Sequence, residues 1–300
     1  MRPIELHHGE LTFSTLEAAP TGAGRGETVL LLHGFPDHAR SFRAQLPALA
    51  AAGYRAVAPT LRGYEPSSQP RDRDYHLDAI ARDVFAFADE LGVERFHLVG
   101  HDWGALVGYV AAALHGDRLA SLTTLAVPHP GRLVREGLFR VPRQIRLSSY
   151  VLFFQLRGVA EFALERDDWA MLERLWRDWS PGWTVPSEEL ALLKRTFAQP
   201  GVKRAALAYY RANFDVLSRQ GRAVGALLRA RVEAPTLALT GALDGCMDSR
   251  LHDLVMHADD FPRGVTVARV EGAGHFLHQE KPERVNAELL AWLEAHPALG

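Results

Sequence analysis

The stretch of residues 98–108 constrains the fold more strongly than any other part of the sequence. It opens as a short apolar run, ends as an apolar helical pattern, and carries Gly-x-Asp-x-Gly between them, with Asp102 at the centre. This is the spacing of a nucleophile elbow, a sharp turn between a strand and a helix that raises one side chain above a sheet. Gly100 and Gly104 fit such a turn because they remove side chains that would collide where strand and helix pack closely.

The residue at the centre of this motif narrows the chemistry. Most such elbows carry a serine, whereas this one carries Asp102. A carboxylate that attacks a substrate forms a different covalent intermediate from a hydroxyl. The alternative interpretation is structural, with Asp102 as the N-cap of a glycine-rich helix that follows a buried strand.

Apolar runs alternate with helical patterns along the first part of the chain. Residues 4–18 predict an antiparallel hairpin, and residues 38–52 and 77–92 predict helices. Further strands are expected at residues 28–32, 54–59, 96–100 and 119–127. Such alternation predicts an α/β fold with a mostly parallel sheet and helices on both faces.

The alternation stops in the middle of the chain. Between about residues 131 and 231 the sequence shows no convincing buried strand, only helical pieces rich in aromatic residues. The pattern resumes with strands expected at residues 235–241 and near 264–270 and with helices expected near 248–257 and 282–294. We therefore predict a core domain of residues 1–130 and 232–300 and an inserted helical cap, or lid, of residues 131–231.

Composition limits the partners and the compartment. The formal net charge is −2, and no basic stripe favours nucleic acid or an anionic membrane surface. The arginines of the middle third are interpreted as solvated helix faces. Residues 1–8 show no apolar signal core, and no window is long enough to span a membrane. Cys246 is the only cysteine, and the 14 histidines show no metal-ligand spacing, so we expect a cytoplasmic protein without a metal site.

A carboxylate nucleophile requires a base to activate the water that later releases the product. Histidine suits this role, and a second acid should hold the histidine in place. In this chain order, the acid should follow a late strand and the histidine should follow the last strand. Asp244 comes just after the strand expected at 235–241, and His275 follows the last expected strand. The order predicts a triad of Asp102, His275 and Asp244.

Each of the two later residues also has a plain structural interpretation. Asp244 precedes a glycine and could be a turn residue, and His275 could be an ordinary loop histidine. Asp248, Asp253 and Glu271 lie near the same strand ends and compete for the role of the acid. The occurrence of all three triad residues in order and at strand ends favours the catalytic interpretation.

A His-Gly-Phe-Pro segment at residues 33–36 follows the first buried strand. The backbone N–H groups of Phe35 and Trp103 could converge on an oxygen of Asp102 as an oxyanion hole. Pro36 has no N–H, and its fixed φ could instead shape the loop, with a cis bond as one option. The alternative is a plain turn at the end of a strand.

These motifs resemble those of the α/β-hydrolase superfamily and, within it, of the soluble epoxide hydrolases. The resemblance covers nearly the whole chain. The segments at residues 33–36 and 100–104, together with Asp244 and His275, stand where that family has its motifs. The resemblance implies that Asp102 is the nucleophile, that His275 is the base and that Asp244 is the acid that orients it.

The family also uses two tyrosines of the cap domain, which hydrogen-bond the epoxide oxygen and protonate it as the ring opens. Tyr150 precedes a Phe-Phe-Gln segment and resembles the first of them. Tyr210 stands in a Tyr-Arg segment and resembles the second, with Tyr209 as the alternative. Without the resemblance, such tyrosines would be interpreted as core or interface aromatics.

The resemblance thus implies an epoxide hydrolase that opens a small apolar epoxide to a vicinal diol. Asp102 would form an alkyl ester, and His275 would activate the water that hydrolyses it, without any cofactor. The substrate is the expected partner, and the apolar cap could also carry a surface for a homodimer. The residues expected to line the substrate pocket are His33, Pro36, Trp103 and Phe154.

Two other functions stay open on the same residues. A haloalkane dehalogenase would share Asp102, Trp103 and His275, but it typically has Asn after His-Gly, where this chain has Phe35. A non-catalytic ligand-binding protein on the same fold would not need the complete triad. The sequence does not identify the epoxide, the carbon that is attacked, the preferred enantiomer or the number of subunits.

Overall fold

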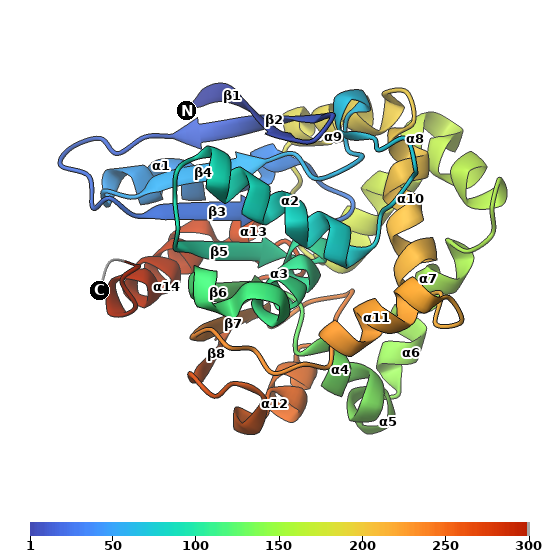
Figure 1. Cartoon of the computed structure of the whole chain (residues 1–300). Helices are drawn as coiled ribbons and strands as arrows, with labels where there is room; N and C mark the ends of the chain where they lie inside the picture. The colour runs from blue at the N-terminus through green and yellow to red at the C-terminus, as the bar shows by residue number, and fades with distance from the viewer. Residues whose placement is uncertain (299–300) are drawn as a thin grey trace.

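An eight-stranded sheet runs through the computed structural model, which describes residues 1–298 (Figure 1). Its strands follow the spatial order β1-β2-β4-β3-β5-β6-β7-β8. The pairs β1–β2 and β2–β4 are antiparallel, and every other neighbouring pair is parallel. The strands are β1 (Arg2–His8), β2 (Leu11–Ala18), β3 (Thr28–Leu32), β4 (Arg55–Pro59), β5 (Phe96–His101), β6 (Leu119–Leu125), β7 (Thr236–Gly241) and β8 (Val265–Val270).

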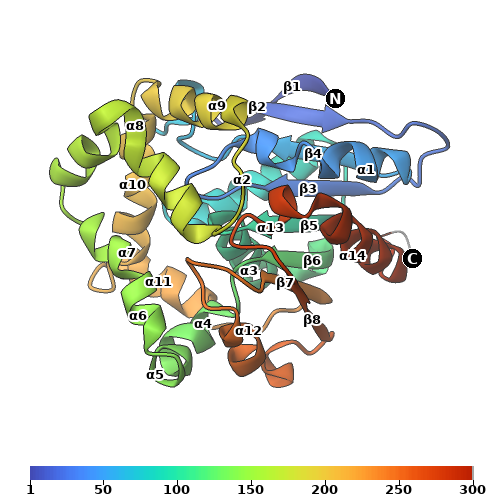
Figure 2. The same ribbon diagram turned by 180° about the vertical axis from the view of Figure 1, so that it is seen from behind.

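Helices cover both faces of the sheet. α2 (Leu77–Glu90) and α3 (Trp103–His115) lie on the face that Figure 1 shows in front. α1 (Gln45–Ala51), α13 (Leu277–Glu280) and α14 (Pro282–Ala295) lie on the opposite face, which Figure 2 shows. The predicted α/β fold with a mostly parallel sheet is therefore confirmed.

The central strand β3 shows why the sequence of a parallel strand is a continuous apolar run. Its four leucine and valine side chains are fully buried and point alternately to the two faces. Val29 and Leu31 pack in the cluster that includes residues of α1 and α14, and Leu30 and Leu32 pack in the cluster that includes residues of α2 and α3. Both faces are covered, so neither set of positions can be polar.

One expected helix is shorter than its pattern indicated. Residues 38–52 divide into the 3₁₀ turn η1 (Ala39–Phe42) and helix α1. Pro47 gives the physical reason, because in a continuous helix it would lack an N–H donor and its ring would clash with the carbonyl of Arg43. Since α1 begins at Gln45, Pro47 stands in its first turn, where proline is tolerated.

The segment between β6 and β7, residues 126–235, contains no strand. We call it the helical insertion; both views show it beyond the end of the sheet to which the parallel strands point (Figures 1 and 2). The division into a cap at residues 131–231 and a core stays a prediction, and residues 299–300 of the expected core lie outside the described residues. The insertion consists of α4 (Pro130–Arg132), the π-helical turn η4 (Leu133–Gly137), α5 (Leu138–Arg140), α6 (Arg143–Leu147), α7 (Ser149–Phe153), α8 (Val159–Trp179), α9 (Ser187–Ala198), α10 (Val202–Asn213) and α11 (Arg219–Leu227).

The longest helix of the insertion is irregular. α8 is interrupted by non-helical backbone angles at residues 166–169. None of the helices within residues 1–298 is both long and apolar enough to cross a membrane. The remaining elements are α12 (Arg250–Val255), η2 (Pro66–Ser68), η3 (Gly116–Arg118) and η5 (Ala258–Asp260).

The elbow has the geometry that its motif predicts. β5 ends at His101 and α3 begins at Trp103, with Asp102 between them at φ 51° and ψ −113°. A positive φ is strained for a residue other than glycine, and surrounding packing must hold it. A Cβ atom at Gly104 would collide with the carbonyl oxygen of Leu32, so the close packing of helix on strand requires glycine there.

Replacing Gly104 with alanine should lower the free energy of unfolding by about 3 kcal/mol, because the new Cβ would meet backbone atoms that cannot rotate away. Gly225→Ala in α11 is the matched control. Its Cβ would meet only the end of the Arg229 side chain, and alanine favours a helix over glycine by up to about 1 kcal/mol. Urea unfolding measures both changes, and equal stability of Gly104→Ala and the wild type would contradict the close packing.

Candidate active site

The predicted site residues come from loops that follow four parallel strands. The loops after β3, β5, β7 and β8 carry Phe35, Asp102, Asp244 and His275, respectively. In an open α/β sheet the carboxyl ends of parallel strands form the edge at which ligands bind. The fold therefore brings these residues to the edge of the sheet that faces the helical insertion.

His275 lies between two carboxylates. Its Nδ1 is 3.0 Å from Oδ2 of Asp244, and its Nε2 is 3.6 Å from Oδ2 of Asp102. All three side chains are buried. The arrangement places a carboxylate, an imidazole and an orienting acid in the order that a nucleophile, a base and its partner require.

The loop after β7 fixes the orientation of Asp244. Its Oδ1 accepts hydrogen bonds from the N–H groups of Cys246 and Met247, at 2.7 and 2.8 Å, which leaves Oδ2 for His275. The nearby acids that competed with Asp244 in the sequence are elsewhere. Asp248 pairs with Arg250, Asp253 pairs with Arg269, and Glu271 is exposed to solvent.

The charges of the three groups depend on one another. Burial alone would lower the pKa of His275, but Asp244 and Asp102 outweigh burial and raise the pKa to about 10. Burial alone would raise the pKa of Asp102, but the charge of His275, with the hydrogen bond from the Phe35 N–H, holds it below its usual range. The free site therefore holds an imidazolium between two carboxylates.

One of the two expected oxyanion-hole donors contacts the elbow directly. The N–H of Phe35 donates to Oδ1 of Asp102 at 2.7 Å. Trp103 is the first residue of α3, so its N–H has no acceptor within the helix and is free for another oxygen. Within residues 1–298 no hydrogen bond joins the Trp103 N–H to the Asp102 side chain. The Phe35–Pro36 bond is cis, which was one option for this loop.

Tyr150 and Tyr210 meet above the elbow. Their ring centroids are 5.8 Å apart, and the Tyr210 ring lies 4.8 Å from that of Trp103. The Tyr150 hydroxyl is 3.5 Å from Sγ of Cys246, whereas the buried Tyr210 hydroxyl has no hydrogen-bond partner in the described part of the chain. Burial raises the pKa of both tyrosines well above the usual range, so both keep their protons at neutral pH.

The structure distinguishes Tyr210 from its neighbour Tyr209. The Tyr209 hydroxyl donates to the carbonyl oxygen of Arg62 at 2.7 Å, and its ring stacks on Tyr75. Tyr209 is thus satisfied within the protein core. Tyr210 alone of the two has a free hydroxyl, and the negative charge of Asp102 contributes to its raised pKa.

Two of the residues expected to line the pocket also have clear structural contacts. His33 uses both ring nitrogens on backbone groups: Nδ1–H donates to the Gly34 carbonyl, and Nε2 accepts from the Leu61 N–H, both at 3.0 Å. The carbonyl of Pro36 accepts a hydrogen bond from Nε1 of Trp176 at 2.6 Å. These contacts position the loop at residues 33–36; contact of either residue with substrate stays a prediction.

Phe154 and Trp103 form apolar walls around the tyrosines. The Phe154 ring lies 5.0 Å from the Tyr210 ring and 5.4 Å from the Phe35 ring, at steep angles typical of edge contacts. Trp103 contacts Tyr210 from another side. The rings around the two phenols are therefore mostly apolar, and their contact with substrate stays a prediction.

Residues of the helical insertion also hold the loops of Asp244 and His275, and sequence reasoning missed them. The carbonyl of Trp179 accepts hydrogen bonds from the N–H groups of Gly245 and His275, at 2.9 and 3.0 Å. The Ser180 hydroxyl next to it donates to Glu280 at 2.6 Å. The end of α8 therefore joins the loop of Asp244 to the loop of His275. A backbone carbonyl has no sequence signature, so no motif could have identified this contact.

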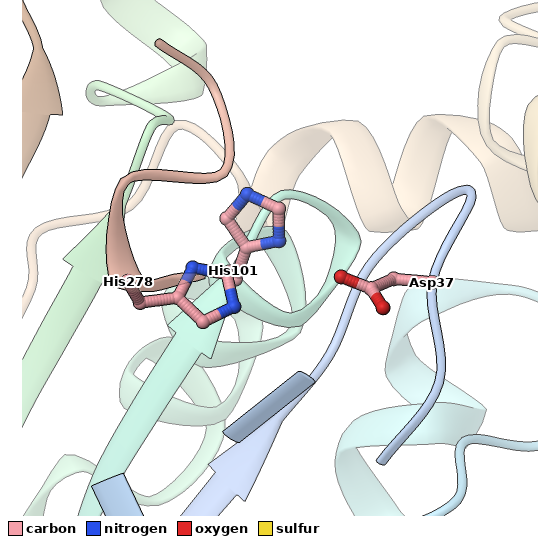
Figure 3. Close-up of side chains that lie close together, drawn as sticks. All are labelled: Asp37, His101 and His278. Atoms are coloured by element: carbon pink, nitrogen blue, oxygen red, sulfur yellow. The ribbon is translucent and has the colours of Figure 1, made fainter. Parts of the chain in front are cut away.

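A second buried group of titratable side chains lies beside His275 (Figure 3). It consists of Asp37, His101 and His278, whose metal-ligating atoms lie within 4.8 Å of one another. The imidazole of His101 points towards Asp37, and the rings of His101 and His278 lie 4.6 Å apart. The spacing of the histidines in the sequence did not reveal this cluster, because its members come from three separate segments: a loop for Asp37, the end of β5 for His101 and α13 for His278.

Hydrogen bonds indicate that the cluster supports the loop of His275. His101 donates from Nε2 to the His275 carbonyl at 3.0 Å, since a carbonyl can only accept. Nε2 of His278 is 2.7 Å from the Ser41 hydroxyl, and Asp37 accepts from the Gln279 amide at 2.8 Å. These contacts join α13 to the turn η1.

Burial sets the protonation of the three side chains in this cluster. Burial lowers the pKa of His101 to about 3 and that of His278 well below the usual range, so both rings are neutral. Burial raises the pKa of Asp37 to about 8, so its carboxyl group is protonated at neutral pH. All three side chains also have hydrogen-bond partners within the protein: the His275 carbonyl for His101, Ser41 for His278 and Gln279 for Asp37. We therefore interpret the cluster as a support for the His275 loop.

Comparison with known proteins identifies the family. The family described as "alpha/beta hydrolase fold" matches residues 27–282. "Epoxide hydrolase A" of Mycobacterium tuberculosis is 32% identical over 93% of this chain and 92% of the relative. "Epoxide hydrolase 4" of Homo sapiens is 31% identical over 89% of this chain and 72% of the relative. The chain belongs to the epoxide hydrolase family of the α/β-hydrolase superfamily.

A solved structure of the same family agrees with this assignment. The crystal structure of epoxide hydrolase A from Mycobacterium thermoresistibile superimposes with a TM-score of 0.80 at 28% identity. It covers 99% of this chain and 100% of its own. The resemblance and the fold class that the motifs predicted are therefore confirmed for this member of the epoxide hydrolase family.

Asp37→Asn should flatten the pH dependence of stability between about pH 4 and pH 8. The folded pKa of Asp37 is about 8 against an ordinary 3.8, so over this range the unfolded chain releases the proton that the folded chain keeps. The wild type therefore loses stability as the pH rises, by at most about 1.4 kcal/mol per pH unit for this group. Urea unfolding at pH 5 and pH 8 measures the effect. If the free energies of unfolding of the variant and the wild type differ by the same amount at pH 5 and at pH 8, then Asp37 is ionised in the folded protein.

Proposed function

We propose that the protein is an epoxide hydrolase that opens an apolar epoxide to a vicinal diol. The observation that carries the proposal is the pair of protonated phenols, Tyr150 and Tyr210, above an aspartate with a histidine and a second acid behind it. The names of the relatives at about 30% identity support the same activity. Opening an epoxide requires both a nucleophile for carbon and an acid for oxygen, and this site supplies both.

In the first step an oxygen of Asp102 attacks an epoxide carbon. The C–O bond of the ring breaks, its electron pair goes to the oxygen, and a proton from Tyr150 or Tyr210 neutralises the alkoxide. The second phenol donates a hydrogen bond to the same oxygen and shares the developing charge. The product is a hydroxyalkyl ester of Asp102 and a tyrosinate, which the proton of the His275 imidazolium can restore to the phenol.

Formation of the ester prepares the base for the second step. Asp102 loses its negative charge, which is one of the two charges that raise the pKa of His275. The pKa of His275 therefore falls, and the neutral imidazole can take a proton from water. The hydroxide attacks the ester carbonyl, and the N–H groups of Phe35 and Trp103 stabilise the oxyanion. The C–O bond to the substrate then breaks, and the departing alkoxide takes the proton of the hydroxyl group that water added to the carbonyl carbon of Asp102. The diol leaves, Asp102 is again a carboxylate, and His275 is again an imidazolium.

We also propose that the helical insertion acts as the cap over this site. In this proposal residues 131–231 form the cap and residues 1–130 and 232–300 form the core. The tyrosines come from the cap and the triad from the core, so the reacting epoxide would lie between them. A cytoplasmic location, the homodimer and the absence of nucleic-acid binding stay predictions.

His275→Gln should trap the ester intermediate, because Asp102 can still attack while the base for hydrolysis is missing. With styrene oxide, mass spectrometry should find the peptide of residue 102 heavier by one substrate, and steady turnover should fall by about 1000-fold or more. Asp102→Asn, which lacks the nucleophile, is the control without an adduct. Release of bromide from a bromoalkane without any diol from the epoxide would instead favour a haloalkane dehalogenase.

Tyr210→Phe should slow ring opening about 100-fold, since it removes one acid from the epoxide oxygen. Tyr209→Phe is a closely matched control. It should cost about 1 kcal/mol of stability through the lost hydrogen bond to Arg62 and leave the rate of ring opening nearly unchanged. Single-turnover kinetics measures the first effect and urea unfolding the second. The opposite result would assign the acid to Tyr209.

A further inference from the structure

One stretch of the helical insertion, residues 134–162, exposes large apolar side chains. Phe139 is 81% exposed and Leu152 is 74% exposed, so most of each apolar side chain lies in water. Others that are more than half exposed are Val134, Ile145, Leu156, Val159 and Phe162. A concentration of such side chains on one segment marks an interaction surface, whereas isolated ones do not.

Arginines stand between these apolar residues. Residues 131–162 contain six arginines, no lysine and two acidic residues, although the whole chain has a net charge of −2. Both acids are already paired, Glu136 with Arg132 and Glu161 with Arg211. Three exposed arginines, Arg135, Arg146 and Arg157, have no ion-pair partner within residues 1–298. The stretch therefore carries unpaired positive charge among exposed apolar groups, which the scattered spacing of these arginines in the sequence did not indicate.

The helices of this stretch lie together on the outside of the molecule. α5, α6 and α7 follow one another along the edge of the insertion in both views (Figures 1 and 2). The loop between α10 and α11 lies beside α7 in both views, and Arg211 of α10 donates to the Phe154 carbonyl at 2.9 Å. Residues 214–217 of that loop add three exposed apolar side chains, Phe214, Val216 and Leu217. We call residues 134–162 and 214–217 the apolar-arginine face.

This face is in contact with the candidate active site. Tyr150 belongs to α7, two residues before the exposed Leu152. The half-exposed ring of Phe214 lies 6.5 Å from the ring of Trp103, the residue next to Asp102. The face therefore adjoins the segments that carry Tyr150 and Trp103.

The exposed apolar side chains and arginines of this face favour one class of partner over the others. A second copy of the chain in a two-fold dimer would bring the same arginines against one another, which is unfavourable without acids between them. Nucleic acid would use the arginines but would leave the apolar side chains in water. Arginine interleaved with exposed Phe, Leu and Ile is instead the pattern that binds lipid interfaces, with apolar groups in the acyl boundary and cations at the phosphates.

We propose that the apolar-arginine face docks on an anionic phospholipid surface. The side chains of Phe139, Ile145 and Leu152 enter the boundary between headgroups and acyl chains. Arg135, Arg146 and Arg157 contact the phosphates. Provided that the protein hydrolyses apolar epoxides as proposed above, this docking would deliver epoxides dissolved in the lipid to the site without passage through water.

Vesicle co-sedimentation tests the docking without any substrate. The full chain should bind vesicles that contain phosphatidylglycerol and bind pure phosphatidylcholine vesicles much more weakly, and added salt should weaken the binding. Changing Arg135, Arg146 and Arg157 together to glutamate should weaken binding about 100-fold or more. Changing Arg73, Arg195 and Arg204 to glutamate is the control, since these exposed arginines lie elsewhere and the change in net charge is the same. Equal loss in both triple variants, or no binding by the wild type, overturns the proposal.

A second measurement separates this inference from the proposed activity. Phe139→Ser with Leu152→Ser should weaken vesicle binding while circular dichroism and thermal unfolding remain those of the wild type. If the protein turns over epoxides, this double variant should keep the rate on dissolved styrene oxide and lose rate on a long-chain epoxide in anionic vesicles. Vesicle binding without any turnover would refute the proposed function alone. A dimer by light scattering that the double variant disrupts, together with no vesicle binding, would assign the face to a second copy and refute the docking.

Discussion

The contact of the His275 imidazole with two buried carboxylates determines most of what this fold must provide. A buried imidazolium is unfavourable unless both of its N–H groups face negative charge, and here Asp244 lies 3.0 Å from one nitrogen and Asp102 lies 3.6 Å from the other. The three groups follow different strands, so the parallel sheet must hold their loops in register. The elbow also places Asp102 at a positive φ, which is strained for a residue other than glycine, so the surrounding packing must hold this conformation.

The helical insertion contacts the candidate active site on its inner side and solvent on its outer side. On its inner side the Trp179 carbonyl joins the loops of Asp244 and His275, and the tyrosines approach the elbow. On its outer side the same insertion exposes apolar residues and arginines. The end of α8 therefore anchors the insertion to the loops of Asp244 and His275.

The cluster beside His275 shows how burial sets protonation in opposite directions for bases and acids. Both histidines lose their charge and Asp37 keeps its proton, so the group is neutral although it contains three titratable side chains. Neutrality is consistent with its place behind an imidazolium, where an additional cation would repel His275. The cluster supports the base through the hydrogen bond of His101 to the His275 carbonyl and leaves the charge of the triad unchanged.

Much of this protein could be predicted from its sequence because the decisive signals are local. Buried strands are continuous apolar runs, the elbow needs glycine at positions 100 and 104, and the residues of the proposed triad follow strand ends in chain order. Tertiary structure alone decided the rest. Tyr209 and Tyr210 differ by about 100° around one helix, so the docking of α10 determines which hydroxyl stays free. The Trp179 contact uses a backbone carbonyl, which every residue has. The Asp37 cluster forms only because the fold brings distant segments together. The apolar-arginine face exists only because the fold leaves certain side chains exposed. The spacing of residues along the chain indicates neither the contacts nor the exposure.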